Sequence, residues 1–231
     1  MSAQKRYRHL FQLESLQTIL TVAGLYGLTA WLGIELTRET GRVALIWLAN
    51  GGLIAVLLST QRRNWPGYVT ASYVANVIAN MVAGDTTFVS TILALINSTE
   101  VIVAAILMRR RYTITPDLTS WPTLFRFAFY CVCLAPMTAA LLAGLFLSSN
   151  LNADFVATVQ RWFLADALGI ITVTPLVLAI RSRIFASAIR TADPLEYAAT
   201  LGLVAICTIG VFSQSSLSFL FVIYTPLIFV A

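Results

Sequence analysis

Long apolar stretches alternate with short polar or basic connections along the whole chain. A helix that spans a bilayer needs about 20 mostly apolar residues, and the chain divides into runs of about that length. The predicted helices cover residues 16–34, 43–60, 65–84, 87–108, 123–147, 160–180, 196–213 and 217–231. The connections are too short to hold a folded enzyme. The pattern therefore predicts an all-α integral membrane protein, a bundle of about eight transmembrane helices behind a cytoplasmic segment at residues 1–15.

Composition separates this chain from soluble proteins. Of its 231 residues, 58% are hydrophobic and only 11% are charged, whereas a soluble domain carries about 25% charged residues. A soluble domain of this size could bury a large core but would need a polar shell. The chain has too few charges to form such a shell, and helices that face lipid do not need one.

The basic residues lie between the apolar runs and indicate an orientation. If the N-terminus is cytoplasmic, the inner segments hold Lys5, Arg6, Arg8, Arg62, Arg63, Arg109, Arg110, Arg111, Arg126, Arg181, Arg183 and Arg190. The outer segments then hold Arg38, Arg42 and Arg161. This asymmetry is typical of the positive-inside rule. We therefore interpret the net charge of +5 as a topology signal and expect no nucleic-acid partner, with both ends in the cytoplasm.

Residues that carry catalytic or metal chemistry are scarce. Cys131, Cys133 and Cys207 fall inside apolar runs, and His9 is the only histidine. A structural zinc site needs about four suitable ligands, and these residues cannot supply them. No phosphate-binding glycine loop or nucleophile–base pair is present. We expect no catalytic domain, no metal site and no cofactor in this chain.

Several polar residues fall within the predicted membrane helices, where polar side chains usually face the bundle interior. Asn76 and Asn80 lie one turn apart, and Asn97 and Glu100 share another helix face. No Lys or Arg lies at the depth of Glu100. Its carboxylate is therefore costly to bury unless asparagines, water, a proton or a cationic ligand stabilise it.

These positions predict a candidate binding site. We expect Asn76, Asn97, Glu100 and Asp166 to line one polar cavity. Further ligand-binding candidates are Trp47 and Asn50 near its outer mouth, and Asn80. Carboxylates with carboxamides suit a small polar or cationic ligand, or a proton. The alternative is that these groups only hold helices together, at roughly 0.6 kcal/mol for each contact.

Four stretches of sequence carry a family resemblance. They are Trp47-Leu48-Ala49-Asn50-Gly51, Trp65-Pro66-Gly67, Asn97-Ser98-Thr99-Glu100 with the basic pair Arg109-Arg110 after it, and Trp162 to Leu176 with Asp166, Gly169 and Pro175. In their order and spacing the chain resembles the MASE-one family, the first type of membrane-associated sensor domain. Members often have prolines after the first tryptophan, where this chain has Leu48 and Ala49.

The resemblance implies a sensory input domain in the bacterial inner membrane. Its output would be a cytoplasmic diguanylate cyclase, acting in cyclic-di-GMP signalling, or a histidine kinase. The implied partners are the lipid bilayer, a small ligand or membrane protein, and a second copy of the full-length protein. Because the chain ends at Ala231 inside an apolar run, we expect residues 16–231 to be a sensor domain cut before its last helices and output domain.

Two other functions fit the same helices. A small-solute transporter or channel would also use polar residues in mid-membrane and proline-broken helices, but no basic residue lies in the predicted core. The third candidate is a purely structural anchor. A reading frame for an output domain downstream of codon 231 would favour the sensor, and a stop codon would favour the transporter.

The predicted orientation can be tested with reporter fusions. Fusions at residues 40, 86 and 154 should report a periplasmic location, and fusions at residues 115 and 188 a cytoplasmic one, because the basic residues lie on the cytoplasmic side. A single inverted loop would show that the predicted number of helices is wrong.

Overall fold

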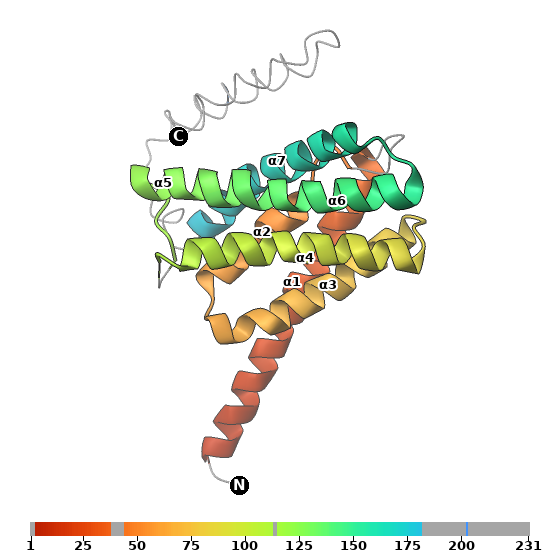
Figure 1. Cartoon of the computed structure of the whole chain (residues 1–231). Coiled ribbons are helices and arrows are strands. Elements are labelled where there is room, and N and C mark those ends of the chain that lie inside the picture. The colour runs from red at the N-terminus through yellow and green to blue at the C-terminus, as the bar shows by residue number, and fades with distance from the viewer. Residues whose placement is uncertain (1–2, 38–43, 113–114, 182–201, 203–231) are drawn as a thin grey trace. The chain divides into compact units, whose positions relative to one another are not determined.

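The structure, a computed structural model, describes residues 3–37, 44–112, 115–181 and 202. The chain divides into two compact units, Met1–Ser182 and Arg183–Ala231, and the account below concerns the first. Every regular element in the described residues is a helix (Figure 1). These are α1 (Ala3–Thr37), α2 (Leu48–Ser59), η1 (Arg62–Asn64), α3 (Trp65–Val82), α4 (Thr87–Arg109), α5 (Trp121–Phe127), η2 (Ala128–Leu134), α6 (Ala135–Leu151) and α7 (Phe155–Arg181).

The first six predicted runs all form helices, and the predicted all-α class is confirmed for the described residues. Four helical stretches are long and apolar enough to cross a membrane: Leu16–Leu36, Thr87–Arg109, Trp121–Leu151 and Phe155–Arg181. The predicted helices at 196–213 and 217–231 lie outside the described residues, apart from Gly202. The total of eight and the orientation of the two ends therefore remain predictions.

Helix α2 is shorter than the sequence pattern indicates. The apolar run begins at residue 43, but the helix begins at Leu48 and has 12 residues. At about 1.5 Å per residue it is roughly 18 Å long, less than the ~30 Å thickness of a bilayer core. The backbone of Trp47 is not helical, and its N–H donates to the carbonyl oxygen of Ala165 in α7 at 3.2 Å. This contact between helices holds the residue just before α2, and the helix begins only after it.

The short helix α2 forms the centre of the first unit. It packs against α7, α4, α1 and, less extensively, α3, and nine of its 12 residues are buried. Its sequence is apolar on all sides, as expected of a helix enclosed by others rather than facing lipid. The hydrophobic core accordingly gathers around Ile54, Leu57 and Leu58, none of which is accessible to solvent.

Two glycines allow α2 and α7 to approach closely. A Cβ on Gly51 would lie 2.7 Å from the carbonyl oxygen of Gly169, and a Cβ on Gly169 would collide with the carbonyl group of Trp47. One turn along α7, the hydroxyl of Thr174 donates to the carbonyl oxygen of Gly51 at 2.8 Å. Close helix contacts through small residues are characteristic of membrane bundles.

The predicted helix at 123–147 is continuous but contains one turn of different geometry. Residues Ala128–Leu134 form a π-helical segment between α5 and α6. Pro136 follows immediately, at the start of α6. A proline ring clashes with the carbonyl four residues earlier, here that of Val132, and a wider turn relieves the clash. The sequence predicts one regular helix here, because the proline does not interrupt the apolar run.

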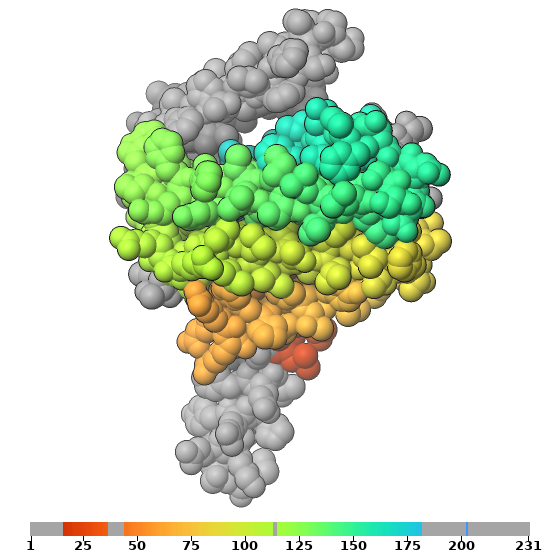
Figure 2. All heavy atoms as spheres, viewed as in Figure 1, coloured from red at the N-terminus to blue at the C-terminus, as the bar shows by residue number. Residues whose placement is uncertain are grey.

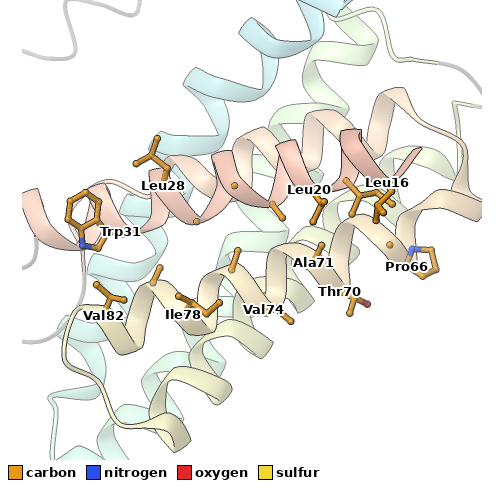
Figure 3. A pocket seen from close by; sticks show the side chains of 17 residues that line it. Leu16, Leu20, Leu28, Trp31, Pro66, Thr70, Ala71, Val74, Ile78 and Val82 are labelled. Carbon is orange, nitrogen blue, oxygen red and sulfur yellow. The ribbon is translucent and has the colours of Figure 1, made fainter. Parts of the chain in front are cut away.

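Outward-facing surfaces of the unit are apolar. Helices α1 and α3 run side by side and leave a groove of about 980 Å³ between them, lined by residues such as Leu20, Trp31, Val74 and Ile78 (Figure 3). Leu20 and Ile78 are more than half exposed. Helices α4 and α6 also pack against each other (Figure 2), and their outer residues include exposed leucines. Exposed apolar surface of this extent requires a partner or lipid, as expected of a membrane protein.

Replacing Gly169 by alanine should separate α2 from α7. The new methyl group meets the fixed backbone of Trp47, so we expect Gly169→Ala to reduce the stability of the purified protein by about 1–3 kcal/mol or more. The measurement is the Tm in detergent. Gly24→Ala is the matched control, because a Cβ there meets nothing within 4 Å and alanine favours the helix. Equal Tm values for both variants would contradict the account.

Candidate functional site

Buried polar side chains gather around α2, where α1, α3, α4 and α7 meet it or one another. The members predicted from sequence are Asn50 on α2, Asn76 and Asn80 on α3, Asn97 and Glu100 on α4, and Asp166 on α7. Each is at least 96% buried. Because buried polar groups lose their hydrogen bonds to water, each needs a partner inside the protein.

Five of these side chains, one of them unpredicted, form a continuous chain of hydrogen bonds. Asn80 Nδ2 donates to Asn76 Oδ1 at 2.8 Å, and Asn76 Nδ2 donates to the Tyr26 hydroxyl at 3.2 Å. The Tyr26 hydroxyl donates to Asn50 Oδ1 at 2.7 Å. Asn50 Nδ2 donates to Asn97 Oδ1 at 3.2 Å. The chain joins α3, α1, α2 and α4 through side chains alone.

Two carboxyl groups lie beyond the end of this chain. Glu100 follows Asn97 by three residues on the same face of α4 and is completely buried. Its carboxyl group interacts with that of Asp166 on α7 and with the amide of Asn50. No described N–H or hydroxyl group donates a hydrogen bond of regular geometry to either oxygen of Glu100 or to Oδ2 of Asp166. No cation among the described residues contributes to the interactions of either group.

Two indole rings border the carboxyl pair. Trp162, one turn before Asp166 on α7, interacts with the Asp166 carboxyl group, and Trp47 interacts with the Tyr26 hydroxyl. Both tryptophans are more than 90% buried, and neither indole N–H forms a hydrogen bond of regular geometry. The site therefore places two indole donors beside hydroxyl and carboxyl acceptors.

The predicted site residues therefore lie together in one region, although their role in ligand binding is untested. Asn50 bridges Tyr26 and Asn97 within the hydrogen-bonded chain. Asn76 and Asn80 contribute to the chain from α3, and Trp47 is the residue just before α2. The position of Trp47 and Asn50 near an outer mouth stays a prediction.

Sequence reasoning missed Tyr26 and, as a site residue, Trp162. Tyr26 could have been identified from the sequence. Tyrosine usually lies near the membrane interface, but Tyr26 lies near the middle of its apolar run. The sequence points to Trp162 through the family motif, and in the structure its side chain interacts with Asp166.

The chemistry of this arrangement favours binding over catalysis. Three carboxyl oxygens and two indole N–H groups form no hydrogen bond of regular geometry, and buried groups left unpaired cost about 1–3 kcal/mol each. A small polar ligand, a cation or a proton would supply the missing partners. Cys131 is buried against the carbonyl of Ala104, and among the described residues no group of three His, Cys, Asp or Glu side chains could hold a metal ion.

Removal of the Tyr26 hydroxyl should break the chain in its middle. Tyr26→Phe leaves Asn50 Oδ1 and Asn76 Nδ2 buried without this partner, so we expect a loss of about 1–3 kcal/mol in stability, measured as a lower Tm. Tyr73→Phe is the control, since the Tyr73 hydroxyl on α3 takes part in no hydrogen bond that the described residues show. It should change stability by less than about 0.5 kcal/mol. Equal Tm values for the two variants would contradict the bridging role.

Similarity to known proteins supports the resemblance noted in the sequence. A search of the curated proteins and a search of the solved structures gave no match. The family model of MASE1, the first type of membrane-associated sensor domain, matches residues 18–231. This match includes every residue of the polar site and nearly the whole chain. The protein belongs to the MASE1 family.

Proposed function

We propose that this chain is the sensory input of a bacterial inner-membrane signalling protein, with a diguanylate cyclase or a histidine kinase as its cytoplasmic output. The MASE1 match supports the input role. The excess of basic residues in the inner segments supports a cytoplasmic N-terminus. The full-length protein would work as a homodimer.

The observation that carries a ligand-binding role is the pair Glu100 and Asp166. Two carboxyl groups adjoin each other in the bundle interior with three oxygens unpartnered. Polar side chains that only hold helices together would be expected to satisfy one another's hydrogen bonds, as the asparagine chain does. Two ionised carboxyl groups cannot do so with each other, because neither has a donor, so the arrangement favours a binding site for a small polar or cationic ligand, or a proton.

The site lies where binding could move helices relative to one another. Glu100 belongs to α4 and Asp166 to α7, and both helices pack against α2. A ligand that draws the two carboxyl groups together, or holds them apart, would shift α7 along its close contact with α2. Such small shifts of packed helices are a common switching device. The ligand can drive the shift only if it binds the two arrangements with unequal affinity.

Helix α7 also contains a point at which it can bend. Pro175 lies inside the helix and cannot donate to the carbonyl of Ile171. The bend would lie between Asp166 and the inner end of α7 at Arg181. A displacement at the carboxyl pair would thus reach the chain beyond residue 181 through a helix with one weakened turn.

A small-solute transporter or channel remains the second candidate, because the same buried carboxyl groups could line a translocation path. Uptake of a labelled solute by proteoliposomes of the purified chain, lost in Glu100→Gln, would favour that function. The family match favours the sensor.

Glu100→Gln should alter signalling without unfolding the protein. Glutamine keeps the size and hydrogen-bonding capacity of a protonated glutamate but cannot take a negative charge. We expect cyclic-di-GMP or kinase output of the full-length protein to change severalfold, while membrane insertion and Tm stay near those of the wild type. Glu35→Gln is the control, because Glu35 is an exposed residue of α1.

Two outcomes would contradict this function. If Glu100→Gln and Glu35→Gln both leave output unchanged, the carboxyl pair only holds helices together. If residues 1–231 can be replaced by an unrelated membrane anchor without loss of regulation, the input role itself is wrong.

A further inference from the structure

A second site lies at the C-terminal end of α4, about two and a half helical turns beyond Glu100. A pocket of about 510 Å³ is lined by Gln61, Arg62, Arg109 and Tyr112. Arg62 opens the short η1 turn between α2 and α3, and Arg109 is the last residue of α4. The fold thus brings two guanidinium groups, 47 residues apart in sequence, to one concave surface.

The two arginines are held in place by the ends of helices. Arg62 Nη2 donates to the carbonyl oxygen of Arg109 at 2.8 Å, and Arg109 Nη2 donates to the carbonyl oxygen of Thr60 at 2.7 Å. These carbonyls close α4 and α2, where the helical hydrogen bonds have run out. The guanidinium of Arg62 also lies 5.8 Å from the ring of Trp65. The groups are therefore preorganised, with N–H donors of Arg62 still available.

Further positive charge surrounds the pocket. Arg126 Nη1 donates to the Tyr112 hydroxyl at 2.9 Å. A hydrogen bond with Thr123, together with the Arg126 and Arg111 guanidinium groups, lowers the pKa of Tyr112. Asp117, the acid in the connection between α4 and α5, is occupied by the backbone N–H and hydroxyl of Thr119. None of the four residues that line the pocket is acidic.

Basic residues at a helix end usually serve only as topology signals, and exposed arginines spread over a surface would need no other explanation. Here helix-end carbonyl groups fix two guanidinium groups side by side at one concavity, and Arg62 keeps N–H donors with which it can bind an anion. Planar forked donors match the oxygens of a phosphate group. Trp65 and Trp121 begin the two neighbouring helices, and tryptophan favours the headgroup level.

We propose that the pocket of Gln61, Arg62, Arg109 and Tyr112 binds the phosphate group of a phosphate ester at the inner membrane surface. A headgroup of an anionic phospholipid supplies this chemistry at the right depth, and a soluble phosphate supplies it from the cytoplasm. The bound group would join the α2–α3 turn to the end of α4 and so stabilise the bundle at its inner end.

The test measures lipid binding by the purified full chain in neutral detergent. Native mass spectrometry would follow titrations with phosphatidylglycerol and with phosphatidylcholine, which carries no net charge. We expect the wild type to prefer phosphatidylglycerol about fivefold. Arg62→Gln should abolish the preference, and so should Gln61→Glu, which places a carboxylate in the pocket and keeps every arginine. Arg63→Gln is the control, because Arg63 is exposed next to Arg62 but does not line the pocket.

A second arm separates the two sources of phosphate. If millimolar inorganic phosphate raises the Tm of the wild type but not of Arg62→Gln, and phosphatidylglycerol shows no preference, the ligand is a soluble phosphate. If phosphatidylglycerol is preferred and inorganic phosphate has no effect, the ligand is a lipid. The proposal is overturned if Arg62→Gln and Gln61→Glu bind both probes like the wild type. It is also overturned if Arg63→Gln loses as much binding as they do, since general surface charge would then be the cause.

Discussion

The close approach of α2 and α7 through Gly51 and Gly169 is the constraint on which the rest of the first unit depends. Neither position has room for a side chain, and the backbone of Trp47 bonds directly to Ala165 across the contact. Because α2 is too short to span a bilayer by itself, it must be enclosed by longer helices, and this contact encloses it on one side. The same contact brings Asp166 from α7 toward α4 and α2.

The polar residues around the enclosed helix α2 determine how the neighbouring helices are arranged. In lipid there is little hydrophobic force to select one arrangement of helices over another, so packing and interhelical hydrogen bonds must do so. The chain from Asn80 to Asn97 specifies the mutual register of four helices, because every link needs its donor opposite its acceptor. A slip of one turn on any helix would leave buried amides unpaired, at about 1–3 kcal/mol each.

The sequence predicted the elements better than their contacts. Runs of about 20 apolar residues identified the first six helices because lipid imposes that length. Spacings of three and four residues placed Asn97 with Glu100, and Asn76 with Asn80, on common faces. Tyr26 could not be placed in this way, because its partners lie 24 and 50 residues away. The late start of α2, at Leu48 instead of residue 43, was missed for a similar reason, since it lies next to a backbone bond to a distant helix.

The helix α4 connects the two kinds of polar site in this unit. Its middle carries Asn97 and Glu100 in the buried network, and its last residue, Arg109, forms part of the arginine pocket. Between them, residues such as Val101, Ala104 and Met108 pack against the core. This packing holds the C-terminal part of α4 rigid. A shift of α4 at Glu100 would therefore reach Arg109 and, through its hydrogen bond to Thr60, the end of α2. Occupancy of the arginine pocket would in turn resist that shift, because the two sites bias the position of the same helix.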